Sequence, residues 1–141
     1  MRFRVVLDTN VLVAALRSRR GASFRLLGLI GTGRFDVVVS VPLVLEYEDA
    51  MLRAAADVGF VREAVGDILD YVCAVADRRE IFFLWRPFLK DPGDDLVLEV
   101  GVAGECDAIV TFNEADFVGA EDFGLQVLRP VEFLQMIGEV P

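Results

Sequence analysis

The feature that most constrains the fold of this chain is the alternation of short apolar runs with helical stretches. The runs at 3–7, 36–39, 81–85, 108–112 and 125–128 have the apolar, β-rich composition of buried strands. Helical patterns at about 11–16, 23–30, 42–56, 60–76, 92–103 and 130–137 separate them. Strands that alternate with helices predict an α/β fold, with a parallel sheet covered on both faces. With 141 residues and no linker or repeat, residues 1–141 are expected to form a single domain.

Acidic residues recur where these predicted strands end or helices begin. Asp8 follows the first strand, Asp94 opens a later helix, and Asn113 with Asp116 follows the fourth strand. Glu46 lies within the helix at 42–56. Ligands of open parallel sheets bind beyond the carboxyl ends of the strands, so these positions can converge, although their spacing does not require it. Clustered carboxylates with no histidine suit Mg²⁺ or Mn²⁺.

Capping explains part of this pattern. Asp8 is followed by Thr9 and Asn10, and each of the three is a good N-cap residue. Three caps in a row exceed what one helix needs. Asp94 and Asp95 both stand in a first helical turn, where acids interact favourably with the helix dipole. Capping accounts for one of these two acids and leaves the other for a further role.

The remaining candidates are also open to ordinary interpretations. Glu46 shares a helix face with Asp49 and Arg53, which fits a solvated face with an Asp49–Arg53 ion pair as well as a site. Thr111 and Asn113 belong to an ordinary polar loop, or they hydrogen-bond a metal-bound water or a phosphate.

The charge distribution bears on nucleic-acid binding. The chain carries a net charge of −9, which opposes contact with phosphates. Residues 17–34 nevertheless contain five arginines and no acid. Arg17, Arg19 and Arg20 directly follow the helix that begins after Asp8, so either they contact RNA phosphates or they form a solvated loop.

Several classes of protein are excluded by composition. The absence of histidine excludes Ser-His-Asp and Cys-His nucleophile systems and histidine zinc sites. Cys73 and Cys106 have no CxxC spacing, so we expect two buried thiols. No window approaches the roughly eighteen uncharged apolar residues that a spanning helix needs. Arg2, Arg4 and the early Asp8 argue against a signal peptide, and we expect a cytoplasmic protein with no membrane association.

Four segments, taken in order, resemble those of the PIN-domain ribonucleases. They are LDTNVLVAAL, VSVPLVLEYEDAMLR, DPGDDLVLEVGVAGECDAIVTFNEADF and LQVLRPVEFL, and they span nearly the whole chain. The chain looks most similar to the branch of toxins from bacterial toxin-antitoxin pairs that includes the VapC toxins. This resemblance implies a three-layer α/β/α sandwich with a five-stranded parallel sheet. It also implies cleavage of single-stranded RNA with Mg²⁺ or Mn²⁺, and a small antitoxin as partner; a homodimer is compatible with it.

The resemblance assigns residues to the site one by one. The first family aspartate matches Asp8, the helical glutamate matches Glu46, and the aspartate that opens the later helix matches Asp94, with Asp95 beside it. The fourth family acid falls on Asn113, and Asp116 is three residues further on. Two readings follow: Asp116 supplies the missing carboxylate, or the metal is held more weakly.

The implied mechanism is in-line attack on a phosphodiester by a metal-activated water. Asp8 and Asp94 would bind the metal directly, and Asp116 or Asn113 would bind it through water. Glu46 would be a ligand or would orient the attacking water.

Two competing functions remain at this stage. A haloacid-dehalogenase-like phosphatase needs a second aspartate two residues after the first, where this chain has Asn10. A non-catalytic relative that keeps the fold for binding a partner would explain Asn113 as decay of the site.

Overall fold

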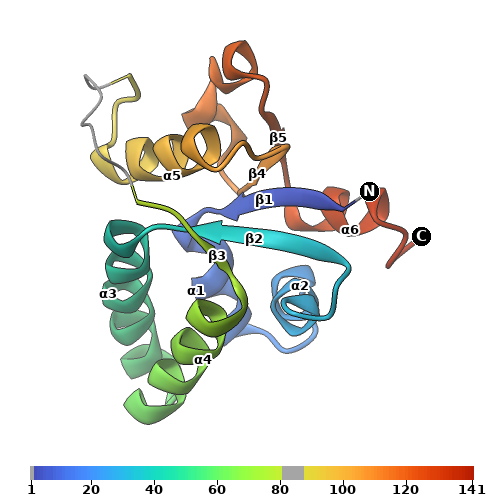
Figure 1. Cartoon of the computed structure of the whole chain (residues 1–141). Helices are drawn as coiled ribbons and strands as arrows, with labels where there is room; N and C mark the ends of the chain where they lie inside the picture. The colour runs from blue at the N-terminus through green and yellow to red at the C-terminus, as the bar shows by residue number, and fades with distance from the viewer. Residues whose placement is uncertain (1, 81–87) are drawn as a thin grey trace.

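The computed structural model describes residues 2–80 and 88–141. Within those residues, five parallel strands form one sheet in the order β3-β2-β1-β4-β5 (Figure 1). The strands are β1 (Phe3–Leu7), β2 (Phe35–Val39), β3 (Asp77–Arg78), β4 (Ala108–Val110) and β5 (Gln126–Leu128). The predicted α/β class and the five-stranded parallel sheet are confirmed.

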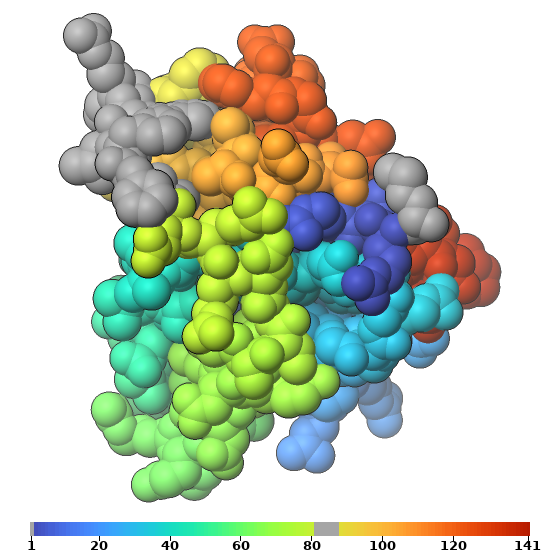
Figure 2. Space-filling view, viewed as in Figure 1, coloured from blue at the N-terminus to red at the C-terminus, as the bar shows by residue number. Residues whose placement is uncertain are grey.

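Helices cover both faces of this sheet. They are α1 (Thr9–Arg17), α2 (Ala22–Leu29), α3 (Val41–Val58), α4 (Arg62–Val75), α5 (Pro92–Ala103) and α6 (Pro130–Met136), with 3₁₀ turns η1 (Glu114–Phe117) and η2 (Ala120–Phe123). In Figure 1, α5 lies over one face, and α1 to α4 lie on the other. The space-filling view shows α4 across the front of the lower half and α5 in the upper half (Figure 2). No helix in the described part of the chain is both long and apolar enough to cross a membrane.

The sheet is apolar on both faces because helices pack against both. Val6 of β1 lies against Gly101 of α5, and Val38 of β2 lies against Gly104, the C-cap residue of the same helix. A Cβ atom at Gly104 would lie only 2.6 Å from Val38 Cγ1. Glycine at this position therefore lets the end of α5 lie close to the sheet.

One edge of the sheet is formed by a strand that the sequence analysis did not predict. The strand predicted at 81–85 lies outside the described residues. The described edge strand is β3, whose polar residues Asp77 and Arg78 do not form an apolar run. Asp77 is instead held by Arg4 of β1, whose Nη2 donates to Asp77 Oδ2 at 2.6 Å. An ion pair, and not an apolar face, marks this strand.

The order in which the chain adds strands to the sheet reverses between β1 and β4. From β1 the chain order runs outward through β2 and β3 on one side, and through β4 and β5 on the other. The crevice beyond the carboxyl ends of two such strands is where open α/β sheets bind ligands. Here those ends meet directly, since the Asp8 N–H donates to the Val110 carbonyl at 2.9 Å.

Candidate functional site

Asp8 lies at the carboxyl end of β1 and caps α1. Its Oδ1 accepts a hydrogen bond from Thr9 N at 2.8 Å, and its Oδ2 accepts one from the Thr111 hydroxyl at 2.7 Å. Asp8 is only 7% exposed, and this burial raises the pKa of its carboxyl. The two hydrogen bonds oppose that rise, while the charges of Asp116 and Asp91 add to it. Asp8 therefore caps α1 and also lies close enough to Asp116 and Asp91 for their charges to raise its pKa.

The loop after β4 is tied to Asp8 through Thr111. This threonine is fully buried, donates to Asp8, and accepts from Asn113 N at 3.0 Å. Asn10 Oδ1 accepts from Phe112 N at 3.4 Å, which adds a second link between α1 and the same loop. Thr111 and Asn10 thus join the start of α1 to the loop after β4 at the carboxyl edge of the sheet.

The three acids at the start of α5 have different surroundings. Asp91 caps the helix, with Oδ1 accepting from Gly93 N at 2.7 Å. Asp95 Oδ1 accepts from Leu89 N at 2.9 Å and from Phe88 N at 3.3 Å, so it fixes the segment before the helix. Asp94 lines a cavity. Asp91 therefore serves as the cap and Asp95 positions the segment before the helix. Asp94 is the acid that neither role explains.

Glu46 of α3 reaches the same helix start. A Cβ atom placed on Gly93 would lie 3.5 Å from Glu46 Oε1 and 3.2 Å from Asp91 Oδ1, so the two carboxylates flank one glycine. The Asp49–Arg53 ion pair does form, at 3.1 Å between exposed side chains. The solvated-face interpretation thus describes Asp49, whereas the half-buried Glu46 points toward α5.

Asp116 and Asn113 both lie on η1 or at its start. The Asn113 carbonyl accepts from Asp116 N at 3.0 Å, and both residues are exposed. Asp116 lines the same cavity as Asp94, while Asn113 is not among its lining residues. The charge of Asp116 also raises the pKa values of Asp8 and Asp94. Of the two positions, Asp116 is the one that adds a carboxylate to the cluster.

The cavity lies between the start of α5 and η1 and has a volume of about 370 Å³. It is lined by Phe88, Leu89, Lys90, Asp91, Asp94, Ala115, Asp116 and Val118. Partial burial raises the pKa of Asp94 to about 7, and the neighbouring charges, that of Asp8 first, contribute to the rise. Asp91 and Asp94 at the start of α5 and Asp116 of η1 therefore line one cavity, and Asp8 lies near enough for its charge to act on Asp94.

The chemistry of this donor set fits a hard divalent cation. Every candidate ligand is a carboxylate or amide oxygen, and a cation would offset both the partial burial and the neighbouring negative charges that raise the pKa of Asp94. As the side chains stand, no three acidic or cysteine residues in residues 2–80 and 88–141 converge closely enough to enclose a metal ion. Mg²⁺ usually keeps several waters and takes only one or two carboxylates, so these oxygen ligands are of the type that it binds.

The predicted arginine group lies away from this cavity. Arg17 ends α1, and Arg19 and Arg20 occupy the exposed turn after it. A helix of nine residues spans about 13 Å, which separates them from Asp8 at its other end. Arg17 pairs loosely with Asp57, at 3.9 Å. The cation that lines the cavity is Lys90.

Sequence reasoning missed Asp91, Lys90 and Phe88 as neighbours of the site. Asp91 stands directly before Pro-Gly at a helix start, which is a recognisable N-cap pattern. That pattern indicates a cap but gives no sign that the same side chain adjoins Glu46. Nothing local to Lys90 or Phe88 reveals the cavity.

Comparisons with known proteins bear on the fold and the family. A family model described as PIN domain matches residues 4–115. The structure is similar to a chain in the crystal structure of VapBC2 from Rickettsia felis bound to a DNA fragment from their promoter. That match has a TM-score of 0.58 and 15% identity, and it covers 88% of this chain and 98% of the other. At this identity the likeness establishes the fold alone. A search of curated proteins finds no match.

Proposed function

We propose that this chain, which belongs to the PIN-domain family, is a metal-dependent endoribonuclease that cleaves single-stranded RNA. The observation that carries the proposal is the set of carboxylates that β1, α3, α5 and η1 bring to the carboxyl edge of the sheet. Partial burial, together with the charges of Asp8, Asp91, Asp116 and Asp95, raises the pKa of Asp94 to about 7. A divalent cation would neutralise these acids. Beside an open cavity it would also activate a water for attack on a phosphodiester.

Each acid has a proposed role. Asp8, held in place by Thr9 and Thr111, and Asp94 would be direct ligands of Mg²⁺ or Mn²⁺. Asp116 would bind through water, and Glu46 would bind or would orient the attacking water. The bound ion would supply the positive charge that lowers the pKa of that water, because the chain has no histidine to act as base.

The supporting residues keep these acids in place. Asn10 and Thr111 join α1 to the loop after β4, and Asp95 fixes the segment before α5. Asn113 would contribute through the backbone carbonyl that accepts from Asp116 N. Arg17, Arg19 and Arg20 would bind RNA phosphates remote from the bond that is cut.

A toxin role and an antitoxin partner are part of the same proposal. The similar structure is named as a VapBC2 complex bound to promoter DNA, which supports a small antitoxin partner for this chain. We propose a single domain over residues 1–141, acting on RNA in the cytoplasm, and a homodimer is compatible with this arrangement.

The phosphatase alternative is disfavoured by Asn10. The position where that class needs its second aspartate holds an amide whose oxygen accepts from Phe112 N at 3.4 Å. A purely binding protein is the stronger alternative, because it needs the fold without the chemistry.

A single experiment separates the three functions. Fluorescent single-stranded RNA is incubated with the purified protein in EDTA, Mg²⁺ or Mn²⁺, and p-nitrophenyl phosphate is tested in parallel. We expect RNA cleavage only with metal and no release of p-nitrophenol. Glu46→Gln should abolish cleavage, and Glu48→Gln, an exposed glutamate two residues along α3, is the matched control. RNA that is bound but never cut would support the binding protein instead.

A further inference from the structure

We infer that Phe88, with Val118 and Phe123 beside it, forms a stacking subsite for a nucleobase of the RNA next to the acid cluster. This inference rests on the proposed ribonuclease function and names how that site would hold its substrate. Phe88 and Val118 line the same cavity as Asp94 and Asp116, so the apolar wall and the acids share one opening.

The apolar side chains of this wall are exposed to solvent. Phe88 is 48% exposed, Phe123 is 41% exposed and Val118 is 72% exposed. The three residues come from the segment before α5 and from the η1–η2 region, which are distant in sequence. An apolar surface assembled from separate segments beside a polar cavity is typical of a ligand site.

Phe88 is held in position by three kinds of contact. Asp95 accepts hydrogen bonds from the backbone of Phe88 and Leu89, at 3.3 and 2.9 Å. The rings of Phe88 and Phe123 meet edge to face, with centroids 5.4 Å apart. A Cβ atom on Gly119, which has a φ of +100°, would lie 3.0 Å from the Phe88 ring. The ring is thus placed before any ligand arrives, which lowers the entropic cost of binding.

Electrostatics explain why stacking suits this site. The chain carries −9, and Asp91, Asp94 and Asp116 line the cavity, so phosphate contacts alone would hold RNA poorly there. Stacking on an aromatic ring is insensitive to that charge and accepts any base. Lys90, the one lysine of the sequence, lines the same cavity and would bind an adjacent phosphate.

Phe112 is the other exposed aromatic residue near Asp8, and it fits this role less well. The Arg129 guanidinium lies over its ring, 5.9 Å from the centroid, and Phe112 does not line the cavity. One face of the Phe112 ring already has a partner, so Phe88 is the better stacking residue.

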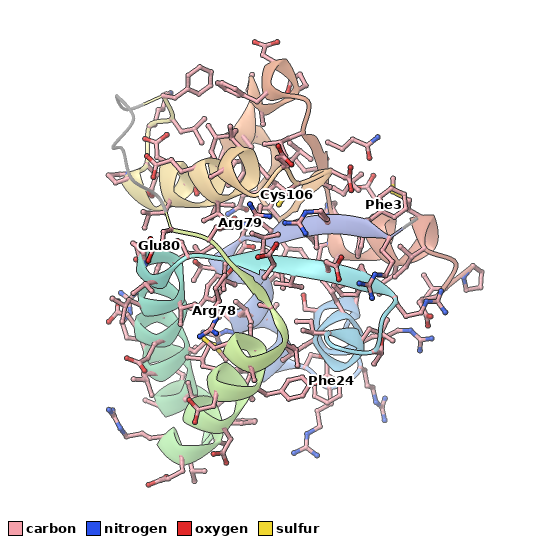
Figure 3. The ribbon with its side chains drawn as sticks, in the orientation of Figure 1. Phe3, Phe24, Arg78, Arg79, Glu80 and Cys106 are labelled. Carbon is pink, nitrogen blue, oxygen red and sulfur yellow. The ribbon has the colours of Figure 1, made fainter. Side chains whose placement is uncertain are left out.

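The test uses three variants of the full chain. Phe88→Ala removes the ring, Phe88→Trp enlarges it, and Phe24→Ala is the control. Phe24 is 42% exposed, close to the exposure of Phe88, and lies on α2 in the opposite layer (Figure 3). Cleavage is measured on a single-stranded oligonucleotide and on a series in which one abasic position is moved along the strand.

We expect Phe88→Ala to raise KM about ten-fold with little change in kcat, because stacking binds the substrate and leaves the reacting phosphate untouched. Phe88→Trp should restore KM, and Phe24→Ala should leave it unchanged. An abasic site at one fixed distance from the cut should raise KM for the parent and should add nothing for Phe88→Ala.

Other outcomes would overturn the inference. If Phe88→Ala cleaves as the parent does, or keeps the abasic penalty, the wall does not stack a base, although the ribonuclease function stands. If the parent cuts no RNA, the proposed function fails, and fluorescence anisotropy on the same oligonucleotides becomes the readout. Equal RNA affinity of parent and Phe88→Ala would then overturn the stacking subsite.

Discussion

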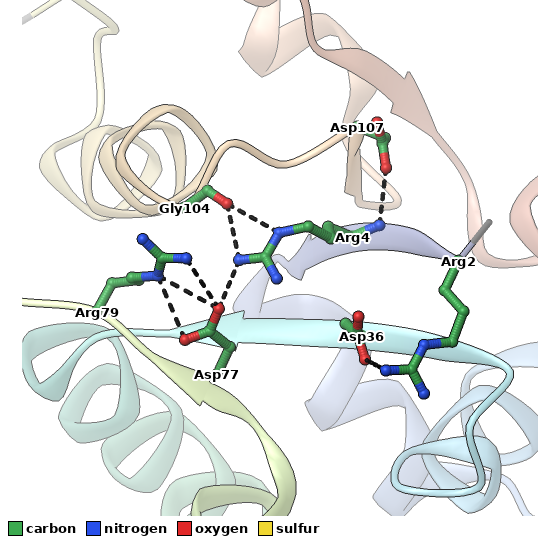
Figure 4. Close-up of polar contacts among 7 residues, drawn as sticks. All are labelled: Arg2, Arg4, Asp36, Asp77, Arg79, Gly104 and Asp107. Carbon is green, nitrogen blue, oxygen red and sulfur yellow. Dashed lines mark hydrogen bonds and ion pairs between the residues drawn. The ribbon is translucent and has the colours of Figure 1, made fainter.

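Two clusters of charged side chains lie against the same sheet. One pairs positive with negative groups, whereas the other brings negative groups together. Around Arg4, guanidinium groups and carboxylates alternate: Arg4 contacts Asp77 and the Gly104 carbonyl, and Arg79 also contacts Asp77 (Figure 4). These hydrogen bonds, that from Arg4 first, hold the pKa of Asp77 below its usual value. Around Asp94, burial and neighbouring acids raise the pKa to about 7.

This difference distinguishes a cluster that stabilises the fold from one that is suited to a ligand. The Arg4 cluster is complete without any added ion, and it holds the edge strand β3 to the sheet. The acid cluster gathers like charges that the described protein atoms do not neutralise, which costs stability in the absence of a cation. Proteins accept such a cost at functional sites. Five predictions test this contrast, in order of decreasing effect.

Asp94→Asn should lower RNA cleavage by at least about 100-fold, since even indirect contacts to a metal ion are worth 10–100-fold. The same variant should melt a few degrees higher than the parent in EDTA, because one repelling charge is gone. Activity and thermal melts are measured together. Asp70→Asn, an exposed aspartate on α4, is the control and should change neither. A lower melting temperature for Asp94→Asn would mean that the residue is structural and that the contrast is wrong.

Arg4→Met should destabilise the fold by about 1–2 kcal/mol. It removes hydrogen bonds to Asp77 and to the Gly104 carbonyl, and the partial exposure of the pair moderates the loss. Urea denaturation measures the effect. Arg2→Met, which removes the more exposed Arg2–Asp36 pair, is the matched control and should cost less. Equal losses would show that the Arg4 cluster is no more than a surface ion pair.

Asp116→Asn should lower cleavage roughly ten-fold, in the range expected for a contact made through water. Asn113→Asp should have little effect, because Asn113 does not line the cavity. Mn²⁺ titration calorimetry on both variants checks the assignment. Tighter Mn²⁺ binding by Asn113→Asp, with Asp116→Asn silent, would transfer the role to position 113. Two variants that match the parent would remove the whole η1 loop from the site.

The two clusters should give opposite pH dependence of stability in EDTA. Folding raises the pKa of Asp94 from roughly 3.9 to about 7, so the folded state binds this proton more tightly. Its contribution is present at low pH and is lost as the pH rises from about 4 to about 7. The lowered pKa of Asp77 has the opposite sign, so its contribution is lost as the pH falls below about 4.

Urea denaturation from pH 3 to 8 resolves the two contributions, and that of Asp94 is on the order of 1 kcal/mol after allowance for its partial exposure. Asp94→Asn should remove the loss on the alkaline side, and Asp77→Asn should remove the loss on the acid side. If both variants follow the parent curve, the charge contrast does not affect stability.

The smallest effect is expected at Arg17, Arg19 and Arg20, which neither cluster includes. Changing all three to Ala should weaken RNA binding slightly and flatten its salt dependence, by roughly 0.7 in the slope for each lost phosphate contact. RNA binding is measured by anisotropy between low and high salt, with proteins that also carry Asp94→Asn so that the RNA is not cut. An unchanged slope would mean that the RNA path does not reach the end of α1.

The sequence predicted most of the fold because strand and helix signals are local. The apolar run at 3–7 became β1, and the Pro-containing starts at Pro42, Pro92 and Pro130 fall in the first turns of α3, α5 and α6. It did not predict β3, because Asp77 and Arg78 are polar, pair with β2, and are further held by Arg4 across 73 residues. No pattern within a short window records such a contact.

For the site, the sequence alone determined the residue types and their order: an acid after the first strand, acids at the start of α5, and no histidine. Only the tertiary structure decided which acids face one another. It separates Glu46 from Asp49, gives Asp91, Asp94 and Asp95 different surroundings, and places Asp116 rather than Asn113 at the cavity. The reason is physical: repulsion and burial depend on distances in space and on solvent exposure, and these are set by packing between elements far apart in the chain.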